Sequence, residues 1–496
     1  MSKPTPFRVD DSDVSVLRQA IASIGRAGYC ETAVCHRLGL DDITNLTWRH
    51  LPIYRDERLI SRDGLALAIE LFLLQSALPP DELHRLLPDS SRDVLLRTEI
   101  LEIDEGGLAR ARASLFPVGT SLVFSDHAWP ELPHPGYVTV PYDQVMAVGI
   151  DSRHLVHATV RRPVRLALDL CTGSGVHALL AAARAERVIA VDINPRAVHC
   201  TRFNARALGI ANLEVVEGDL FEPVGNDRFD LITANPPFVS SPVNALRFRD
   251  GGPSGEDVQR RIVAGLPHYL APGGIAHLVT ELGERDGEPV TRRLREWLGE
   301  APIDVYVLRL ARYTSAQYAI AHAKGGDYGT FLESARAWAG NLRTQGFAGV
   351  VSVLIAFRWS SPECGSPWER MDECHPPQRS AGVEIEETFR AEQLARHPNL
   401  RSHLEGKRLR RSDPIARFDS SVLGGGGIPT KTRASRLGQA LTIEYDLGTF
   451  ERQILDGLNG AVEVSELLQL CRESDVEEAS ALDAIRSLLR RGLVSI

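Results

Sequence analysis

The chain has 496 residues, of which 43% are hydrophobic and 24% charged, and its formal net charge at pH 7 is −9. This length allows two to four domains, and the composition is typical of a globular protein. The acidic balance excludes a general electrostatic attraction to nucleic acid or anionic membranes. Seven irregularly spaced cysteines argue against a secreted disulfide scaffold. The first residues lack a signal-peptide pattern and the apolar stretches are too short to span a bilayer, so we predict a cytoplasmic protein.

One segment reverses the overall charge. Residues 401–436 contain nine lysines and arginines against three acids, which gives this segment a net charge of +6 and leaves −15 for the rest of the chain. Such a patch can contact a phosphate backbone or an acidic peptide. A basic run is more often a solvated linker, and we favour that interpretation.

The first quarter of the chain predicts a small separate domain. Apolar residues recur at helical spacing, and short strand-like runs come after them. The helices are predicted at residues 14–28, 65–78 and 80–87, and the strands at 111–115 and 121–124. We therefore expect a helical or winged-helix-like domain over residues 1–130, followed by a proline-rich connector.

From residue 163 onward, predicted strands alternate with predicted helices, which is typical of a parallel sheet covered by helices. The strands are predicted at residues 166–170, 188–192, 213–217, 230–234, 275–280, 303–310 and 350–357. The helices are predicted at residues 175–185, 195–208, 256–266, 290–298 and 328–342. Residues 140–358 thus predict one doubly wound α/β domain with a seven-stranded, Rossmann-like sheet.

The pattern changes again after residue 358. Residues 359–436 include a stretch rich in proline, serine and cysteine and a run of four glycines, and we predict a linker with an excursion. Short helices are predicted at residues 450–458, 464–471 and 479–491. Residues 437–496 are therefore expected to form a second small helical or winged-helix-like domain.

The most informative motif is the tetrapeptide Asn235, Pro236, Pro237 and Phe238. It follows an apolar run at residues 229–234 that predicts a buried parallel strand, so it would lie at the sheet edge where open α/β folds bind ligands. The two prolines stiffen the loop and remove two backbone donors. The remaining amide, carbonyls and aromatic ring suit a planar NH2 group, because carbonyls accept its hydrogens and a ring can stack on its plane.

Glycines and acids at three earlier strand ends predict a bound ligand beside this tetrapeptide. Glycines before a helix allow a ligand to approach the backbone. Asp169 could accept from a ligand ammonium, Asp192 could bind a ribose diol, and Asp219 could accept from an adenine amine. The candidate ligand-binding residues are Asp169, Cys171, Thr172, Gly173, Gly175, Asp192, Ile193, Asp219, Leu220 and Asn235.

On these residues the chain resembles the class I S-adenosylmethionine-dependent methyltransferases over residues 140–358. The segment from Asp169 to Gly175 is similar to their first motif, and Asp192 and Asp219 are similar to their ribose-binding and adenine-contacting acids. Asn235 begins a loop similar to that of the amino-methylating enzymes, which act on release-factor glutamine, rRNA guanine N2 or adenine N6. The resemblance implies S-adenosyl-L-methionine as cofactor and nitrogen as the methylated atom.

The acceptor molecule stays open at this point. One alternative is a macromolecule, either a protein glutamine or an RNA base, with the flanking domains as recognition modules. Another is a peptide or small metabolite, with the flanking domains as a cap and a contact for a homodimer. A more distant alternative, an NAD(P)-dependent oxidoreductase, explains the glycines and Asp192 but not Asp219 or the Asn235 loop. The cysteine–histidine group at residues 364–375 lacks the spacing of structural zinc sites, and the group at residues 30–36 lies in a segment predicted to be helical, so we expect no metal.

Overall fold

The computed structural model describes residues 7–46, 50–127, 141–243, 245–361, 365–412, 415–420, 431–437, 440–458, 460–474 and 476–496. The chain divides into two compact units. Unit one comprises Met1–Leu155, Arg162–Asp286 and Tyr313–Val350, and unit two comprises Val156–Arg161, Gly287–Arg312 and Val351–Ile496. The predicted connector at residues 130–135 and the glycine run at 424–427 lie outside the described residues.

The N-terminal part of unit one is mostly helical. Its helices are α1 (Val14–Arg26), α2 (Glu31–Leu38), α3 (Leu51–Ile53), α4 (Gly64–Ala68), α5 (Pro80–Leu86) and α6 (Asp89–Arg97). Two antiparallel hairpins follow, formed by β1 (Leu101–Ile103) with β2 (Ala109–Ala111) and by β3 (Ser114–Val118) with β4 (Ser121–Ser125). The predicted helix at 65–78 is interrupted, because α4 passes into a π turn over Ile69–Leu73 and the backbone of Gln75 is left-handed with φ 57°.

This helical part packs onto helix α9 (Pro195–Leu208). The helix is specified at both ends, since Asn194 accepts a hydrogen bond from the N–H of Arg196 at 3.1 Å and Gly209 ends it at φ 74°. On its buried face, Asn204 accepts from the N–H of Phe124 at 2.9 Å and donates to the Phe124 carbonyl at 2.8 Å. Both polar atoms of a fully buried amide are therefore satisfied, which fixes β4 against α9.

The central sheet has eight strands in the order β12-β10-β11-β9-β8-β5-β6-β7. The strands are β5 (Val164–Leu170), β6 (Ala185–Asp192), β7 (Leu213–Glu217), β8 (Phe229–Ala234), β9 (Leu270–Glu284), β10 (Ile303–Thr314), β11 (Gly349–Trp359) and β12 (Glu369–Glu373). The pairs β5–β6, β6–β7, β5–β8, β8–β9 and β10–β12 are parallel. The doubly wound fold predicted from the sequence is confirmed, and β12 is an additional strand.

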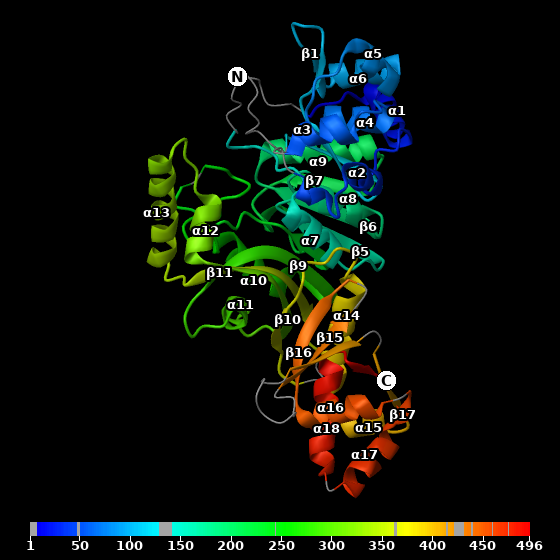
Figure 1. Cartoon of the computed structure of the whole chain (residues 1–496), viewed down its shortest axis with the longest axis vertical. Coiled ribbons are helices and arrows are strands. Elements are labelled where there is room, and N and C mark those ends of the chain that lie inside the picture. Colours follow the sequence, from blue (N-terminus) through cyan, green and yellow to red (C-terminus); the bar gives the residue numbers. More distant parts are fainter. Residues whose placement is uncertain are drawn as a thin grey trace. The chain divides into compact units, whose positions relative to one another are not determined.

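The strand order reverses at β5. The chain runs from β5 outward to β7 and then returns to the other side of β5 as β8. In open α/β sheets such a reversal leaves a crevice beyond the carboxyl ends of the strands, and ligands bind there. Figure 1 shows helices α8 (Val176–Ala182) and α9 beside strands β6 and β7. Burial of β5 along nearly its whole length agrees with its central, covered position.

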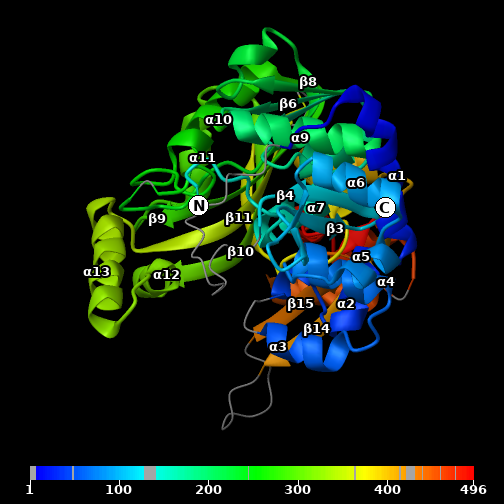
Figure 2. The same cartoon turned by 90° about the horizontal axis from the view of Figure 1, so that it is seen from above.

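Two helices are inserted between β10 and β11. Helices α12 (Ser315–His322) and α13 (Tyr328–Thr344) lie side by side as a hairpin in Figures 1 and 2. Thr314 starts α12 with a capping box to Gln317. Tyr318 and Trp338 pack with Val239 in a buried cluster, so the hairpin covers the chain that follows Phe238.

Unit two also contains helices and strands that are not part of the eight-stranded sheet. It contains α11 (Val290–Leu298), α14 (Gly382–Arg396), α15 (Leu400–Leu404), β13 (Arg408–Arg411), β14 (Ile415–Ser420), β15 (Lys431–Leu437), β16 (Thr442–Leu447), α16 (Thr449–Gly457), β17 (Val462–Glu463), α17 (Val464–Glu473), α18 (Glu478–Arg490) and β18 (Val494–Ser495). Much of the segment 359–436, which the sequence predicted to be a linker, therefore has regular structure. Helices α16 to α18 correspond to the three predicted C-terminal helices. Among the described residues, no helix combines the length and the apolar character needed to cross a membrane.

Unit two contains a partly buried arginine on strand β12. Arg370 of β12 donates to Asp372 Oδ1 at 3.0 Å and to Glu392 Oε1 at 3.1 Å. Its guanidinium also lies over the rings of Tyr306 and Tyr445, 5.4 Å and 5.7 Å from the centroids. The Glu392 side chain is completely buried and that of Arg370 is 12% exposed. The Arg370 guanidinium thus pairs with two carboxylates and lies over two aromatic rings.

Candidate active site

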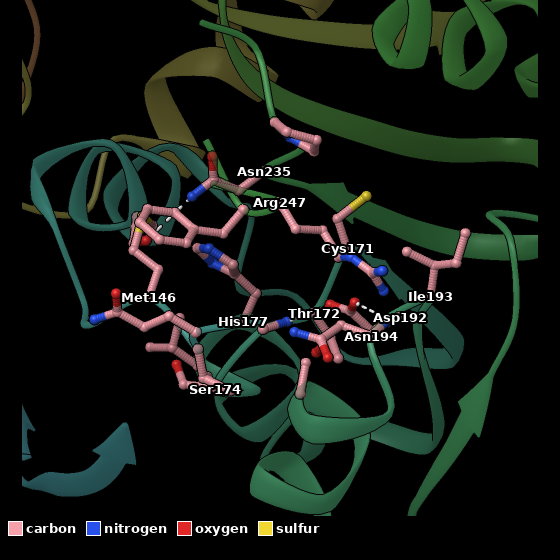
Figure 3. Close-up of a pocket in the computed structure, with 18 residues that line it drawn as sticks. Met146, Cys171, Thr172, Ser174, His177, Asp192, Ile193, Asn194, Asn235 and Arg247 are labelled. Atoms are coloured by element: carbon pink, nitrogen blue, oxygen red, sulfur yellow. Dashed lines mark hydrogen bonds between the residues drawn. The ribbon is translucent and has the colours of Figure 1, made fainter. Parts of the chain in front are cut away.

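A cavity opens at the carboxyl ends of β5, β6 and β8, where the strand order reverses (Figure 3). All of its lining residues belong to unit one. They are Gln144, Val145, Met146, Ser152, Cys171, Thr172, Gly173, Ser174, Val176, His177, Asp192, Ile193, Asn194, Ala197, Asn235, Pro237, Arg247 and Phe248. Seven of the residues predicted for the site are in this set: Cys171, Thr172, Gly173, Asp192, Ile193, Asn235 and Pro237.

The turn after β5 forms the floor of the cavity. Cys171, Gly173 and Gly175 have positive φ angles of 55°, 57° and 85°. The turn is held from two sides, since the Gly173 N–H donates to Asp192 Oδ2 at 2.8 Å and the Thr201 hydroxyl donates to the Gly173 carbonyl at 3.0 Å. The predicted glycine turn is therefore a left-handed backbone segment fixed by contacts to β6 and α9.

Gly175 and Gly173 make a matched pair for a substitution experiment. A Cβ at Gly175 would lie 2.7 Å from Thr201 Cγ2, whereas a Cβ at Gly173 meets no atom within 4 Å. Both substitutions force a side chain into the left-handed region, at a cost of about 1–2 kcal/mol. We expect Gly175→Ala to weaken S-adenosylhomocysteine binding more than Gly173→Ala does, measured by calorimetry. Equal losses of affinity in the two variants would show that the close contact between residue 175 and Thr201 does not affect ligand binding.

Asp169 is turned away from the cavity. It is 1% exposed, and its two oxygens accept hydrogen bonds from Thr172 Oγ1 at 2.6 Å and Thr233 Oγ1 at 2.7 Å. Burial raises its pKa to about 7, although the two threonine hydrogen bonds act in the opposite direction. Asp169 is not among the lining residues, so in this structure it supports the turn from behind.

Asp192 lies at the end of β6 with its carboxylate facing the cavity. The N–H groups of Gly173 and Asn194 donate to its two oxygens at 2.8 Å and 2.9 Å. Burial raises its pKa, while these two backbone donors and Arg247 lower it. A carboxylate offers about four lone-pair sites, so lone pairs remain for a ligand diol.

The residues predicted to contact adenine lie just outside this lining. Asp219 accepts a hydrogen bond from Arg261 Nη2 at 2.8 Å, and Leu220 has a φ of 53° and is 7% exposed. Neither residue lines the cavity described above. Their contact with an adenine ring stays a prediction.

Asn235 lies at the cavity edge with an oriented amide. Its Nδ2 donates to Ser152 Oγ at 3.1 Å, across 83 residues of sequence (Figure 3). In this structure the amide nitrogen faces Ser152, and no described residue donates to the Oδ1 atom. Pro237 also lines the cavity, whereas Pro236 and Phe238 do not. Phe238 instead packs partly buried against the cluster formed with the α12–α13 hairpin.

The loop from Asn235 is fixed by its surroundings. A Cβ at Gly255 would lie 2.4 Å from the Phe238 carbonyl, so only glycine allows this close approach. From the hairpin, Tyr318 accepts from the Ser240 N–H at 3.2 Å and donates to Glu281 Oε2 at 2.9 Å. Burial, followed by repulsion from Asp151, raises the pKa of Glu281 to about 8. The loop is therefore held between a glycine turn and a buried tyrosine.

Several lining residues were not predicted as site residues. Gln144, Val145 and Met146 come from the chain before α7 (Ile150–Ala158), which Asp126 holds by accepting the Val145 N–H at 2.8 Å. Arg247 and Phe248 come from the glycine-rich segment after the Asn235 loop. That segment carried a sequence signal, because its glycines indicate a loop able to close over a ligand.

These residues fit the cofactor that the sequence resemblance implies. The Asp192 carboxylate suits the two ribose hydroxyls. Ile193 lies beside it with 55% of its side chain exposed and lines the same cavity, so it offers an apolar surface to a purine ring. Gly173 leaves open space above the turn. The donor set and the shape of the turn therefore agree with an adenosyl group bound across β5 and β6.

Comparison with known proteins agrees with this site. Residues 147–300 match the family model described as "Methyltransferase small domain". The chain is 37% identical over 155 residues to a release factor glutamine methyltransferase of Geobacter sulfurreducens, covering 28% of this chain and 54% of that protein. It is 40% identical over 134 residues to a ribosomal protein uL3 glutamine methyltransferase of Bradyrhizobium diazoefficiens, covering 24% and 41%. The uL3 enzyme of Bordetella pertussis is 38% identical over 146 residues, covering 26% and 47%.

The chain spans about half the length of the curated relatives that it matches. Within that stretch, the matches confirm the resemblance to class I S-adenosylmethionine-dependent methyltransferases and the Rossmann-like fold. The matched residues include the glycine turn, Asp192, Asp219 and Asn235, all of which lie between residues 147 and 300.

Proposed function

We propose that this chain, whose residues 147–300 match the methyltransferase small domain, transfers a methyl group from S-adenosylmethionine to the amide nitrogen of a protein glutamine. The observation that carries the proposal is the Asn235 amide. It lies at the edge of the cavity that holds Asp192, and its nitrogen side is tied to Ser152. The names of the relatives support glutamine as the acceptor. Action in the cytoplasm is part of the same proposal.

The reaction is a direct displacement. When bound, S-adenosylmethionine would supply the methyl group from an electrophilic sulfonium and would leave as S-adenosylhomocysteine. Asn235 Oδ1 would accept one hydrogen of the acceptor NH2 group, and the Pro236 carbonyl, which does not line the cavity itself, would accept the other; the two hydrogen bonds would orient the nitrogen lone pair for attack. An amide lone pair is delocalised, so hydrogen bonds that favour a pyramidal nitrogen help most in the transition state. The nitrogen releases its proton to solvent after the attack.

The flanking elements suggest how a large acceptor is accommodated. The α12–α13 hairpin packs against Val239, next to the catalytic loop, and Tyr328 at its tip is 79% exposed. A macromolecular acceptor would contact surfaces outside the cavity, and the α12–α13 hairpin offers such a surface. An RNA base is the alternative within this class, and it would have to be splayed out of its stack to reach Asn235. A peptide or small metabolite remains a second alternative.

Two measurements test the proposal. Calorimetry with the purified full chain should show binding of S-adenosylhomocysteine and none of NAD; the reverse result would support an oxidoreductase and end the proposal.

Labelled-methyl transfer into separated protein, RNA and metabolite fractions identifies the acceptor class. We expect label in protein, recovered as N5-methylglutamine after digestion. Label in RNA or in metabolites alone would overturn the glutamine assignment while keeping the methyltransferase.

A further inference from the structure

His177 is a buried histidine inside the cofactor cavity. It lies in the first turn of α8, two residues after Gly175, and lines the cavity. Its side chain is 6% exposed. Figure 3 shows the imidazole reaching into the middle of the cavity, between Asn235 and the turn at Thr172. It is thus placed between the acceptor side and the cofactor side of the site.

The imidazole has an unsatisfied polar atom. His177 Nε2 is buried and has no hydrogen-bond partner among the described residues. Buried polar atoms in native proteins nearly always have a protein or water partner, so an orphaned nitrogen on a ring that lines a cavity is an open hydrogen-bonding position. Burial also lowers the pKa of His177 to about 3, so the ring is neutral at pH 7. A neutral imidazole has one nitrogen that donates and one that accepts, and it forms hydrogen bonds without bringing a charge into the site.

The surroundings indicate which part of the cofactor it meets. Asp192 and Ile193, at the far end of the cavity, suit the ribose and the base, as described above. Asp169 is occupied by Thr172 and Thr233 and does not line the cavity. The charged amino-acid end of the cofactor therefore needs other polar partners near the turn.

We propose that the His177 imidazole hydrogen-bonds the amino-acid end of S-adenosylmethionine, which makes His177 a cofactor-binding residue of this site. The inference rests on the proposed function. Contacts to the adenosyl part do not involve His177, so the residue should distinguish ligands that carry the amino-acid arm from ligands that lack it.

The experiment compares two ligands on the full chain. S-adenosylhomocysteine carries the amino-acid arm, and 5′-methylthioadenosine lacks it. His177→Leu, which preserves most of the side-chain volume, should weaken S-adenosylhomocysteine binding about tenfold or more, as expected for a lost hydrogen bond to a charged group. Binding of 5′-methylthioadenosine should change by less than about twofold. His177→Gln, whose amide can reach the Nε2 position, should restore most of the loss.

A matched control is His277 of β9. It is also buried, at 2% exposed, but it does not line the cavity. His277→Leu should alter thermal stability without separating the two ligands. If His177→Leu weakens both ligands equally, or neither, the inference is overturned. A wild-type chain that binds neither ligand would instead refute the proposed function.

A second measurement does not depend on the fold of a variant. In the wild-type chain with labelled histidine, the His177 ring nitrogens should shift in NMR spectra on addition of S-adenosylhomocysteine. They should shift much less with 5′-methylthioadenosine. Equal shifts with both ligands would contradict a contact to the amino-acid arm.

Discussion

Asn235→Ala is expected to lower the turnover number about 10²–10³-fold, the range observed when one hydrogen-bonding group of a transition state is removed. The reason is that Asn235 Oδ1 would accept an acceptor N–H whose hydrogen bond strengthens as the nitrogen becomes pyramidal. Binding of S-adenosylhomocysteine should change by less than about twofold, because the residues that fit the cofactor best lie in the turn after β5, at the end of β6 and at His177 of α8. Single-turnover methyl transfer and calorimetry measure the two effects separately.

Ser152→Ala is a milder variant that tests the same hydrogen-bond network. It removes the Ser152 oxygen that accepts from Asn235 Nδ2 and leaves Asn235 in place. The amide then becomes free to rotate, and we expect an intermediate loss of turnover of about tenfold, as for a single hydrogen bond.

Unchanged turnover in Asn235→Ala would mean that another group positions the nitrogen. A cofactor affinity that falls together with turnover would mean that the substitution disturbs the whole cavity.

The sequence predicted those site residues whose role depends only on their own residue type and on their immediate neighbours in the chain. The glycine turn needs left-handed backbone at Gly173 and Gly175, and glycine is the residue type that adopts it freely. Asp192 and Asn235 follow apolar runs directly, so their places at strand ends follow from the pattern alone. Such site residues can be predicted because residue type and position in the sequence are sufficient to identify them.

Other features depend on partners that are distant in sequence. The orientation of Asn235 is set by Ser152, and Asp169 turns inward because Thr172 and Thr233 capture its oxygens. A strand end predicts that a carboxylate is present, but not which way its side chain points. The sequence places His177 in the first turn of a helix that covers the sheet, where a buried position is expected, and only the structure shows that it also lines the cavity.

Strand β12 was missed for a different reason. Its sequence, from Glu369 to Glu373, has four charged residues in five, and burial alternates between exposed and intermediate. Edge strands are often charged, because charge prevents pairing with another chain. The strand therefore carries no hydrophobic pattern that would predict it, and the ion pairs of Arg370 within the strand could not be predicted either.

Arg370→Leu is expected to destabilise unit two by about 3–5 kcal/mol, because it removes a cation that pairs with the Asp372 and Glu392 carboxylates. Asp372 and Glu392 have side chains that are 10% and 0% exposed, and Arg370 is an ion-pair partner of both. Glu392 keeps Arg490 at 2.9 Å, so Asp372 is the more severely affected of the two. Hydrogen exchange of the amides of β12 and α14 measures the opening free energy of this region directly.

The matched control is a surface pair in the same unit. Arg292 and Glu296 of α11 are 70% and 57% exposed at 3.2 Å, so Arg292→Leu should cost no more than about 0.5 kcal/mol. The double variant Arg370→Leu with Asp372→Leu should recover part of the loss, because an apolar pair leaves one fewer uncompensated charge. A loss below about 1 kcal/mol in Arg370→Leu, within the range of an exposed ion pair, would contradict the role of Arg370 as the cation that neutralises this core.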